Sequence, residues 1–169
     1  MRSVFFYTLP VIAATLLACY ISSASKDAKP KEITSAENVS PEVNKETGIQ
    51  FIEEDWGKAL KTAQSEGKLV FLDIYATWCG PCKMLKQYTF KDAAVADFFN
   101  KNFINVTVDG EKGAGPELAQ NYAIEGYPTL VVADHTGKPV LMTAGYIPAD
   151  VLMKFANEAL KKGGKQARK

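Results

Sequence analysis

The sequence predicts an α/β domain, with a mixed sheet covered by helices, over about residues 48–160. Strand-like and helix-like segments alternate along this stretch, which is typical of a sheet with helices packed on it. The stretch ends in two short strands, close enough for an antiparallel hairpin, and a final helix. The chain has 169 residues, 47% of them hydrophobic and 23% charged, which suits one globular domain with an extension.

The first half of the predicted domain contains two strand-like segments and three helices. Apolar side chains recur at helical spacing from Trp56 to Ala63, and Glu66-Gly67 ends that helix. The near-continuous apolar run Leu69–Ala76 is typical of a strand buried on both faces. The predicted elements are a short apolar start at Ile49–Ile52, the helix from Trp56, the strand Leu69–Ala76, a helix over Cys79–Tyr88, and a helix with Asp92 as N-cap and Val95, Phe98 and Phe99 on one face.

The second half adds three strands and two helices. Pro116 suits the first turn of a helix, because that position needs no N–H donor. His135-Thr136-Gly137-Lys138 is a turn, so the segments on either side of it are predicted to pair as a hairpin. The predicted elements are the strand Phe103–Val108, a helix carrying Leu118 and Tyr122, the strands Thr129–Ala133 and Pro139–Thr143, and a helix from Pro148 with the apolar stripe Leu152, Phe155, Ala156, Ala159 and Leu160.

Residues 1–18 are predicted to be an export signal rather than part of the fold. Arg2 is followed by an apolar stretch centred on Val4–Ala18, which is the pattern of a secretory signal. Leu16-Leu17-Ala18-Cys19 resembles the bacterial lipobox, in which cleavage before the cysteine is coupled to its lipidation. Two alternatives stay open: cleavage after Ala24, with Cys19 in the discarded peptide, or an uncleaved membrane anchor over Val4–Ile21.

Residues 19–47 are predicted to be a flexible tether, and residues 161–169 a basic tail. The first segment is rich in Ser, Lys, Glu, Asn and Pro without sustained apolar periodicity, so it buries too little surface to offset the entropy of ordering. The last segment carries five basic side chains and two glycines. We interpret it as a solvated end of the chain rather than a contact for anionic lipid.

The charge and cysteine counts exclude several function classes. The chain has 20 basic residues, 19 acidic residues and one histidine, so it lacks the excess of positive charge that is typical of nucleic-acid-binding proteins. Three cysteines are too few for a small secreted protein built on disulfides. A structural zinc usually needs four ligands, and the chain offers no second cysteine pair, while His135 lies in a turn far from the first pair. No metal site is therefore predicted.

The chemistry is predicted at Trp78-Cys79-Gly80-Pro81-Cys82, directly after the buried strand. Cysteines three residues apart face the same side of a helical turn, so their sulfurs can bond. Cys79 falls at the helix N-terminus, where free N–H groups and the helix dipole favour a thiolate. We therefore predict that Cys79 attacks and Cys82 resolves. A static structural disulfide stays open as an alternative, although so short a loop would constrain the chain little.

Asp73 and Pro128 are further candidates from their positions alone. Asp73 lies inside the apolar strand, six residues before Cys79. Burial would raise its pKa, and an acid poised near neutrality could take the Cys82 proton. An exposed or capping Asp73 is the alternative. Pro128 leads into a strand, where proline removes a ladder donor, and a cis bond would explain it, although only about 5–6% of X–Pro bonds are cis.

Together these residues resemble the thioredoxin family. Trp-Cys-Gly-Pro-Cys is its active-site sequence, Asp73 stands at the spacing of its buried acid, and Tyr127-Pro128-Thr129 matches its cis-proline segment. The resemblance covers about residues 48–160 and implies the thioredoxin fold, a buried Asp73, a cis bond at Pro128 and no cofactor. The candidate substrate contacts that it implies are Trp78, Gly80, Pro81, Tyr127, Pro128, Thr129 and Gly145.

One subgroup of that family is the most similar. Leu72–Cys79 and Lys86–Phe90 look like the C-terminal periplasmic domain of the transmembrane thiol:disulfide interchange reductase and related secreted proteins. Two positions depart from cytosolic thioredoxin: Gln87 or a neighbour replaces a helix proline, and Asn105 stands where a lysine is expected beside the buried acid. The second departure leaves open which charged group adjusts the pKa of Asp73.

The sequence therefore predicts a monomeric, extracytoplasmic thiol–disulfide oxidoreductase that reduces or exchanges disulfides. Its predicted partners are disulfide-containing envelope proteins, an upstream membrane thiol reductant, and the membrane itself through a lipid or an anchor. A disulfide oxidase or isomerase is one alternative, although Gly80-Pro81 favours the reducing end of the class. A non-catalytic binding module on the same fold is the other.

Overall fold

The computed structural model describes residues 47–166, the last three by their backbone alone. The predicted signal 1–18, the candidate lipidation residue Cys19 and all of the predicted tether but Thr47 lie outside this range. Among the described helices, none combines the length and the apolar character that crossing a bilayer requires. The elements are β1 (Ile52–Glu53), α1 (Trp56–Glu66), β2 (Leu69–Tyr75), α2 (Gly80–Met84), the π-helical turn η1 (Leu85–Thr89), α3 (Ala93–Asn102), β3 (Phe103–Asp109), α4 (Gly115–Asn121), β4 (Thr129–Ala133), β5 (Pro139–Ala144) and α5 (Ala149–Gln166).

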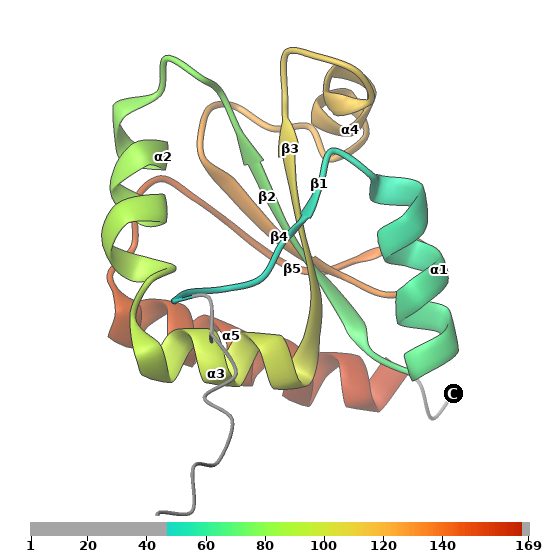
Figure 1. Ribbon diagram of the computed structural model, residues 1–169. Helices are drawn as coiled ribbons and strands as arrows, with labels where there is room; N and C mark the ends of the chain where they lie inside the picture. Colours follow the sequence, from blue (N-terminus) through green and yellow to red (C-terminus); the bar gives the residue numbers. More distant parts are fainter. Residues whose placement is uncertain (1–46, 167–169) are drawn as a thin grey trace, which may run out of the picture. The chain divides into compact units, whose positions relative to one another are not determined.

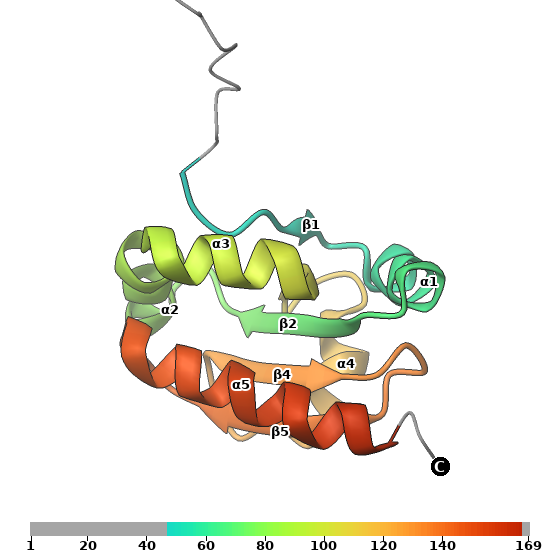
Figure 2. The same ribbon diagram turned by 90° about the horizontal axis from the view of Figure 1, so that it is seen from below.

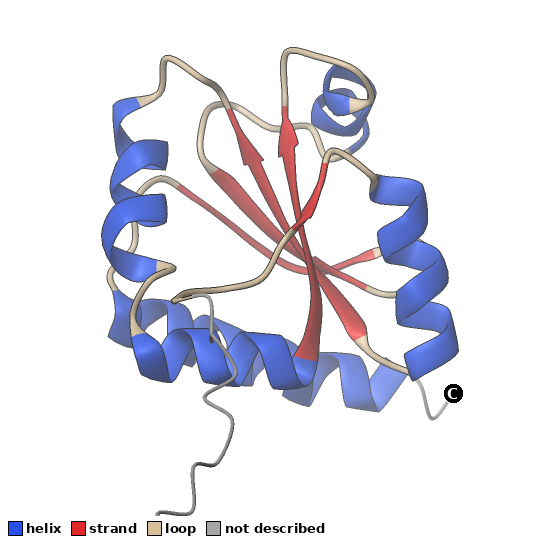
Figure 3. Ribbon diagram, in the orientation of Figure 1, coloured by secondary structure: helices blue, strands red, loops and turns tan. Residues whose placement is uncertain are grey.

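The strands form one mixed sheet in the order β1-β3-β2-β4-β5 (Figures 1 and 3). β1 and β2 run parallel to β3, while β4 pairs antiparallel with both β2 and β5. The predicted hairpin is therefore β4–β5, and the register places Asp73 of β2 directly opposite Thr107 of β3. The predicted α/β class with a mixed sheet is confirmed.

Helices cover both faces of this sheet (Figures 1 and 2). Alternate residues of β2 point to opposite faces, so Phe71 belongs to one core and Val70 and Leu72 to the other. The Phe71 core is packed by α3 and α5 and is rich in buried aromatic rings. The buried residues of the second core are aliphatic, and it is packed by α1 and α4, with partly buried aromatic rings at its edge. Because Asp73 is two residues after Phe71, it lies on the α3 and α5 face.

The helix predicted over Cys79–Tyr88 has two parts. α2 ends at Met84, and η1 follows as a wider turn in which the N–H of Phe90 donates to the carbonyl of Leu85, five residues back, at 2.8 Å. At the other end of the chain, α5 continues to Gln166, into the segment that the sequence separates as a basic tail. There Gly163 is buried against Leu69, which gives this last part of the helix a packing contact.

Candidate active site

The two cysteines of the predicted motif lie where β2 leads into α2. Cys79 is the N-cap of α2, and its sulfur is bonded to that of Cys82. The backbone N–H of Cys82 donates to the Sγ of Cys79 at 3.1 Å. Both side chains are buried, with 2% and 3% of their surface exposed. The predicted pairing and the predicted helix N-terminus are confirmed.

Two aromatic rings border the disulfide. Trp78 is 66% exposed, and its ring meets that of Tyr127 edge to face with 6.0 Å between the centroids. Tyr127 also packs against the small cluster formed by Ala76, Cys79 and Cys82. Gly110 allows this position, because a Cβ there would lie 2.5 Å from Cε1 of Tyr127. The disulfide therefore lies against Tyr127, whose ring contacts the exposed indole of Trp78.

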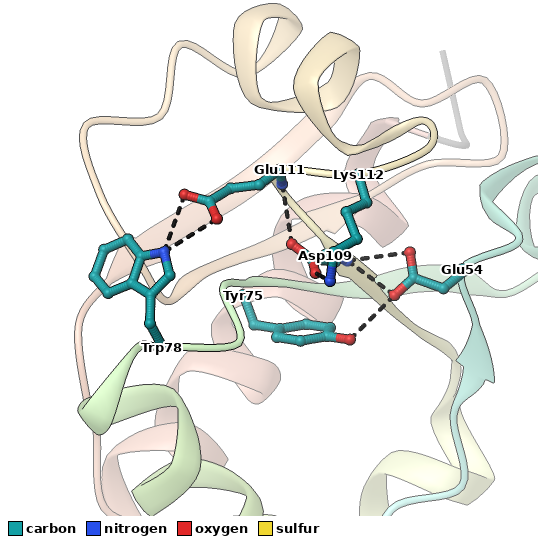
Figure 4. Close-up of polar contacts among 6 residues, drawn as sticks. All are labelled: Glu54, Tyr75, Trp78, Asp109, Glu111 and Lys112. Carbon is teal, nitrogen blue, oxygen red and sulfur yellow. Dashed lines mark hydrogen bonds and ion pairs between the residues drawn. The ribbon is translucent and has the colours of Figure 1, made fainter.

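Acidic side chains at the end of β3 hold this aromatic border in place (Figure 4). The indole N–H of Trp78 donates to both carboxylate oxygens of Glu111, at 3.1 and 3.0 Å. Asp109 is buried, accepts from the backbone N–H of Glu111 and pairs with Lys112 at 2.8 Å. The hydrogen bond from Lys112 lowers the pKa of Asp109, so this carboxyl is ionised.

The loop before β4 lies next to the disulfide as well. The Tyr127–Pro128 bond is cis, which confirms that prediction. The N–H of Gly145 donates to the carbonyl of Pro128 at 2.8 Å, so this candidate contact residue lies beside the proline. Thr129 is buried, and its hydroxyl donates to the carbonyl of Gly126 at 2.7 Å. The Thr129 side chain is therefore turned into the protein, and only its backbone is left to meet a substrate.

Asp73 is buried on β2, as predicted, with 1% of its surface exposed. The hydroxyl of Thr107 donates to Oδ2 at 3.0 Å, while Oδ1 has no hydrogen-bond partner among the described residues. Burial raises the pKa of Asp73 to about 6, although Lys86 and the Thr107 hydrogen bond lower it in part. A carboxyl with this pKa exchanges its proton near neutral pH, which is the property required of a proton acceptor.

Two residues that contact or influence the site, Glu111 and Lys86, are not predicted from the sequence to act there. Glu111 was not singled out, since its contact with Trp78 spans 33 positions and leaves no local pattern. Lys86 carries no sequence signal beyond its place in a segment that resembles a known subgroup, yet from η1 its charge lowers the pKa of Asp73. Asn105 hydrogen-bonds to Gln50 and Asn100 rather than to Asp73.

His135 lies in the predicted turn, and no group of metal-ligating side chains occurs within the part of the chain that the structure describes.

A bonded cysteine pair at a helix start, with a cis-proline loop packed against it and a buried acid on the strand that precedes it, defines a thiol–disulfide oxidoreductase of thioredoxin fold. A family model described as a thioredoxin-like domain matches residues 56–160. The chain therefore belongs to the thioredoxin-like family, and the predicted thioredoxin fold is confirmed.

Known proteins of this kind are similar over the folded part of the chain. The thiol:disulfide interchange protein DsbD of Actinobacillus pleuropneumoniae is 31% identical over 101 residues, which are 58% of this chain and 17% of that longer protein. A proposed disulphide-isomerase from Bacteroides thetaiotaomicron has a solution structure with 43% identity and a TM-score of 0.61, over 68% of this chain and 94% of that one. The oxidised C-terminal domain of Neisseria meningitidis DsbD has 26% identity and a TM-score of 0.52, over 61% and 91%.

Proposed function

We infer that this protein is an exported thiol–disulfide oxidoreductase that reduces or exchanges disulfides in other envelope proteins. The observation that carries the proposal is the Cys79–Cys82 disulfide at the start of α2, flanked by the exposed ring of Trp78. The similarity to DsbD and to a proposed disulphide-isomerase supports the same chemistry. The export signal 1–18 and lipidation at Cys19 are part of the proposal and rest on the sequence.

The first step uses the reduced form of the enzyme. The Cys79 thiolate attacks one sulfur of the substrate disulfide, so that a Cys79–substrate bond forms and the substrate S–S bond breaks. The departing substrate thiolate takes a proton from solvent. The N-cap position favours the attacking thiolate, because the N–H of Cys82 already points at the Cys79 sulfur.

The second step releases the product. Cys82 gives its proton to Asp73, and its thiolate attacks the Cys79 sulfur, which breaks the bond to the substrate. The second substrate thiolate leaves and is protonated by solvent. The substrate has gained two electrons and two protons, and the cysteine pair is left as the observed disulfide. An upstream membrane thiol reductant returns the pair to its reduced form.

The substrate lies along the border of Trp78 and Tyr127 in this proposal. Tyr127 contacts the cysteine cluster, and the backbone of Pro128 and Thr129 follows it directly, with the N–H of Gly145 bonded to the carbonyl of Pro128. Gly80 is exposed and adjoins Cys79, so a peptide can approach the sulfur closely there. Pro81 gives the first turn of α2 a fixed backbone angle.

The direction of the reaction is tested by the reduction potential. Equilibration of the purified domain with glutathione should give a value near that of thioredoxin, about −270 mV, rather than near the strong oxidants at about −120 mV. A value above about −180 mV would contradict the reductase function and would favour an isomerase or oxidase.

The mechanism is tested by insulin reduction and by trapping. We expect Cys79→Ser to abolish insulin reduction, and Cys82→Ser to accumulate mixed disulfides with envelope proteins in cells. Activity that survives Cys79→Ser would contradict the mechanism, and a wild-type domain without activity would favour a binding module. For the full chain, Cys19→Ser should abolish incorporation of labelled lipid; unchanged incorporation would contradict lipidation at this residue.

A further inference from the structure

We propose that Lys86 is a positioning residue for proton transfer at Asp73, and that the ring of Tyr75 holds its ammonium in place. The proposal rests on the proposed function of Asp73 as the acceptor of the Cys82 proton. Asn105 of β3 stands where the family resemblance implies a lysine beside the buried acid. In this protein the positive charge that acts on Asp73 comes instead from Lys86 of η1.

The chain places Lys86 on the cysteine side of the helix. Lys86 follows Cys82 by four residues, so the two side chains share one helical face. The Nζ of Lys86 lies 3.5 Å from the centroid of the Tyr75 ring, well within the range of a cation–π contact. Tyr75 follows Asp73 by two residues on β2, so its ring and the carboxyl lie on the same face of the sheet.

The side chain of Tyr75 is held by a hydrogen bond, so its ring can restrain the Lys86 ammonium. Its hydroxyl donates to Oε1 of Glu54 at 3.2 Å, and Glu54 in turn accepts from the backbone N–H of Asp109 (Figure 4). Burial and the negative charge of Glu54 raise the pKa of Tyr75 to about 12, so the ring stays neutral. A neutral, anchored ring attracts the ammonium through its face and restrains the long side chain.

Lys86 lines the same cavity as Thr107, the residue that hydrogen-bonds to Asp73. The cavity has a volume of about 150 Å³, and its lining includes Glu53, Lys86 and Thr107. The hydroxyl of Thr107 is the donor to Asp73 Oδ2, whereas Oδ1 is buried without a partner among the described residues. The cavity is large enough for water, and it places the Lys86 side chain and the Thr107 hydroxyl that bonds Asp73 along the same wall.

The groups that face Asp73 come from three elements besides its own. Thr107 from β3 and Lys86 from η1 favour the ionised carboxyl, and Glu53 from β1 opposes it. Lys86 is the stronger of the two favourable groups, while burial outweighs both. Without the ammonium, more of Asp73 would be protonated at pH 7 and unable to accept the Cys82 proton.

The decisive experiment titrates Asp73 in the oxidised protein, where the bonded cysteines do not titrate. The pKa is followed by NMR of the Asp73 carboxyl carbon in the wild type, Lys86→Met, Lys86→Arg and the control Lys83→Met. Lys83 is an exposed neighbour of Cys82, so its replacement removes the same charge from the same helix. We expect Lys86→Met to raise the pKa by about one unit, and Lys86→Arg and Lys83→Met to leave it within about 0.3 units.

Kinetics separate a positioning role from a structural one. In single-turnover release from a Cys79 mixed disulfide, the pH midpoint should shift upward by the same unit in Lys86→Met and return in Lys86→Arg. Tyr75→Leu, which keeps Lys86 but removes its support, should give a smaller shift of the same sign. Equal pKa values in Lys86→Met and Lys83→Met would overturn the proposal. Because the titration needs no substrate, it stays informative even if insulin reduction fails.

Discussion

Asp73 and Asn105 are two buried polar residues on the same face of neighbouring strands, and they serve different ends. Each leaves one side-chain oxygen without a partner among the described residues. The Nδ2 of Asn105 donates to the carbonyl of Gln50 at 3.3 Å and to Oδ1 of Asn100 at 3.2 Å. Asp73 receives one hydrogen bond, from Thr107. The amide thus ties down backbone, whereas the carboxyl is left largely unsatisfied.

The comparison shows that two polar residues on one face of the sheet can differ in purpose: Asn105 contributes stability, and Asp73 is suited to the proposed chemistry. An amide has the same charge at every working pH, so Asn105 can hold the segment that leads into β1 under all conditions. A carboxyl that gains and loses a proton must stay short of partners, because strong donors would fix it in the ionised form. In the proposed mechanism, the incomplete hydrogen bonding of Asp73 is a cost in stability that permits proton transfer.

The largest expected effect is a dependence of stability on pH that comes from Asp73. Its pKa is about 6 in the folded protein against an ordinary value of 3.8. Between these values the folded state binds more protons than the unfolded state, so stability falls as pH rises from about 4 to about 7. The pKa shift corresponds to about 3 kcal/mol. Urea unfolding of the oxidised protein at pH 4 and pH 8 measures this fall.

Asp73→Asn should remove that part of the pH dependence, so that the variant gains stability relative to the wild type as pH rises. Asp150→Asn is the matched control, because it makes the same chemical change at an exposed site on α5. If the curves of Asp73→Asn and the wild type stay parallel, the raised pKa is wrong.

A smaller effect is expected at Asn105. Asn105→Ala removes two hydrogen bonds and leaves the carbonyl of Gln50 without that donor, which should cost about 2 kcal/mol at any pH. Activity per folded molecule should stay within about twofold of the wild type. The control is Asn157→Ala, where an exposed amide bonds the carbonyl of Met153. If Asn105→Ala lost activity without losing stability, Asn105 would contribute to the chemistry, contrary to the purely structural role assigned to it.

The smallest effect is expected at Thr107. Thr107→Val keeps the shape of the side chain but removes the donor to Asp73 Oδ2. The lost hydrogen bond favoured the ionised carboxyl, so the pKa of Asp73 should rise further, by a free energy of about 1 kcal/mol. NMR titration measures the rise, and Thr89→Val, at a buried hydroxyl bonded to Ile147, should leave it unchanged. A pKa that falls in Thr107→Val would contradict the assignment.

Local patterns were enough to predict much of this molecule. The apolar run around Asp73 predicts that this residue is buried, and the spacing of Cys79 and Cys82 predicts that they pair at the start of a helix. Resemblance to a known family supplied the cis bond at Pro128, which the local sequence alone does not favour.

Other features depend on contacts between distant parts of the chain. The contact of Asn105 with Gln50 spans 55 positions, and that of Trp78 with Glu111 spans 33. Neither follows a helical or strand period, so packing alone brings the partners together. The shortness of β1 has the same origin, because Asn100 and Asn105 take over the backbone groups of Gln50 before the strand begins.

The burial of the two sulfurs has a consequence for the proteins on which the enzyme acts. With 2% of Cys79 exposed, an attacked disulfide has to project beyond its own protein surface to reach it. Disulfides in the interior of a folded client meet this condition only while that part of the client is locally open. Under the proposed function, the frequency of such opening would limit the turnover of these clients, in addition to the contacts that they make with Trp78 and Tyr127.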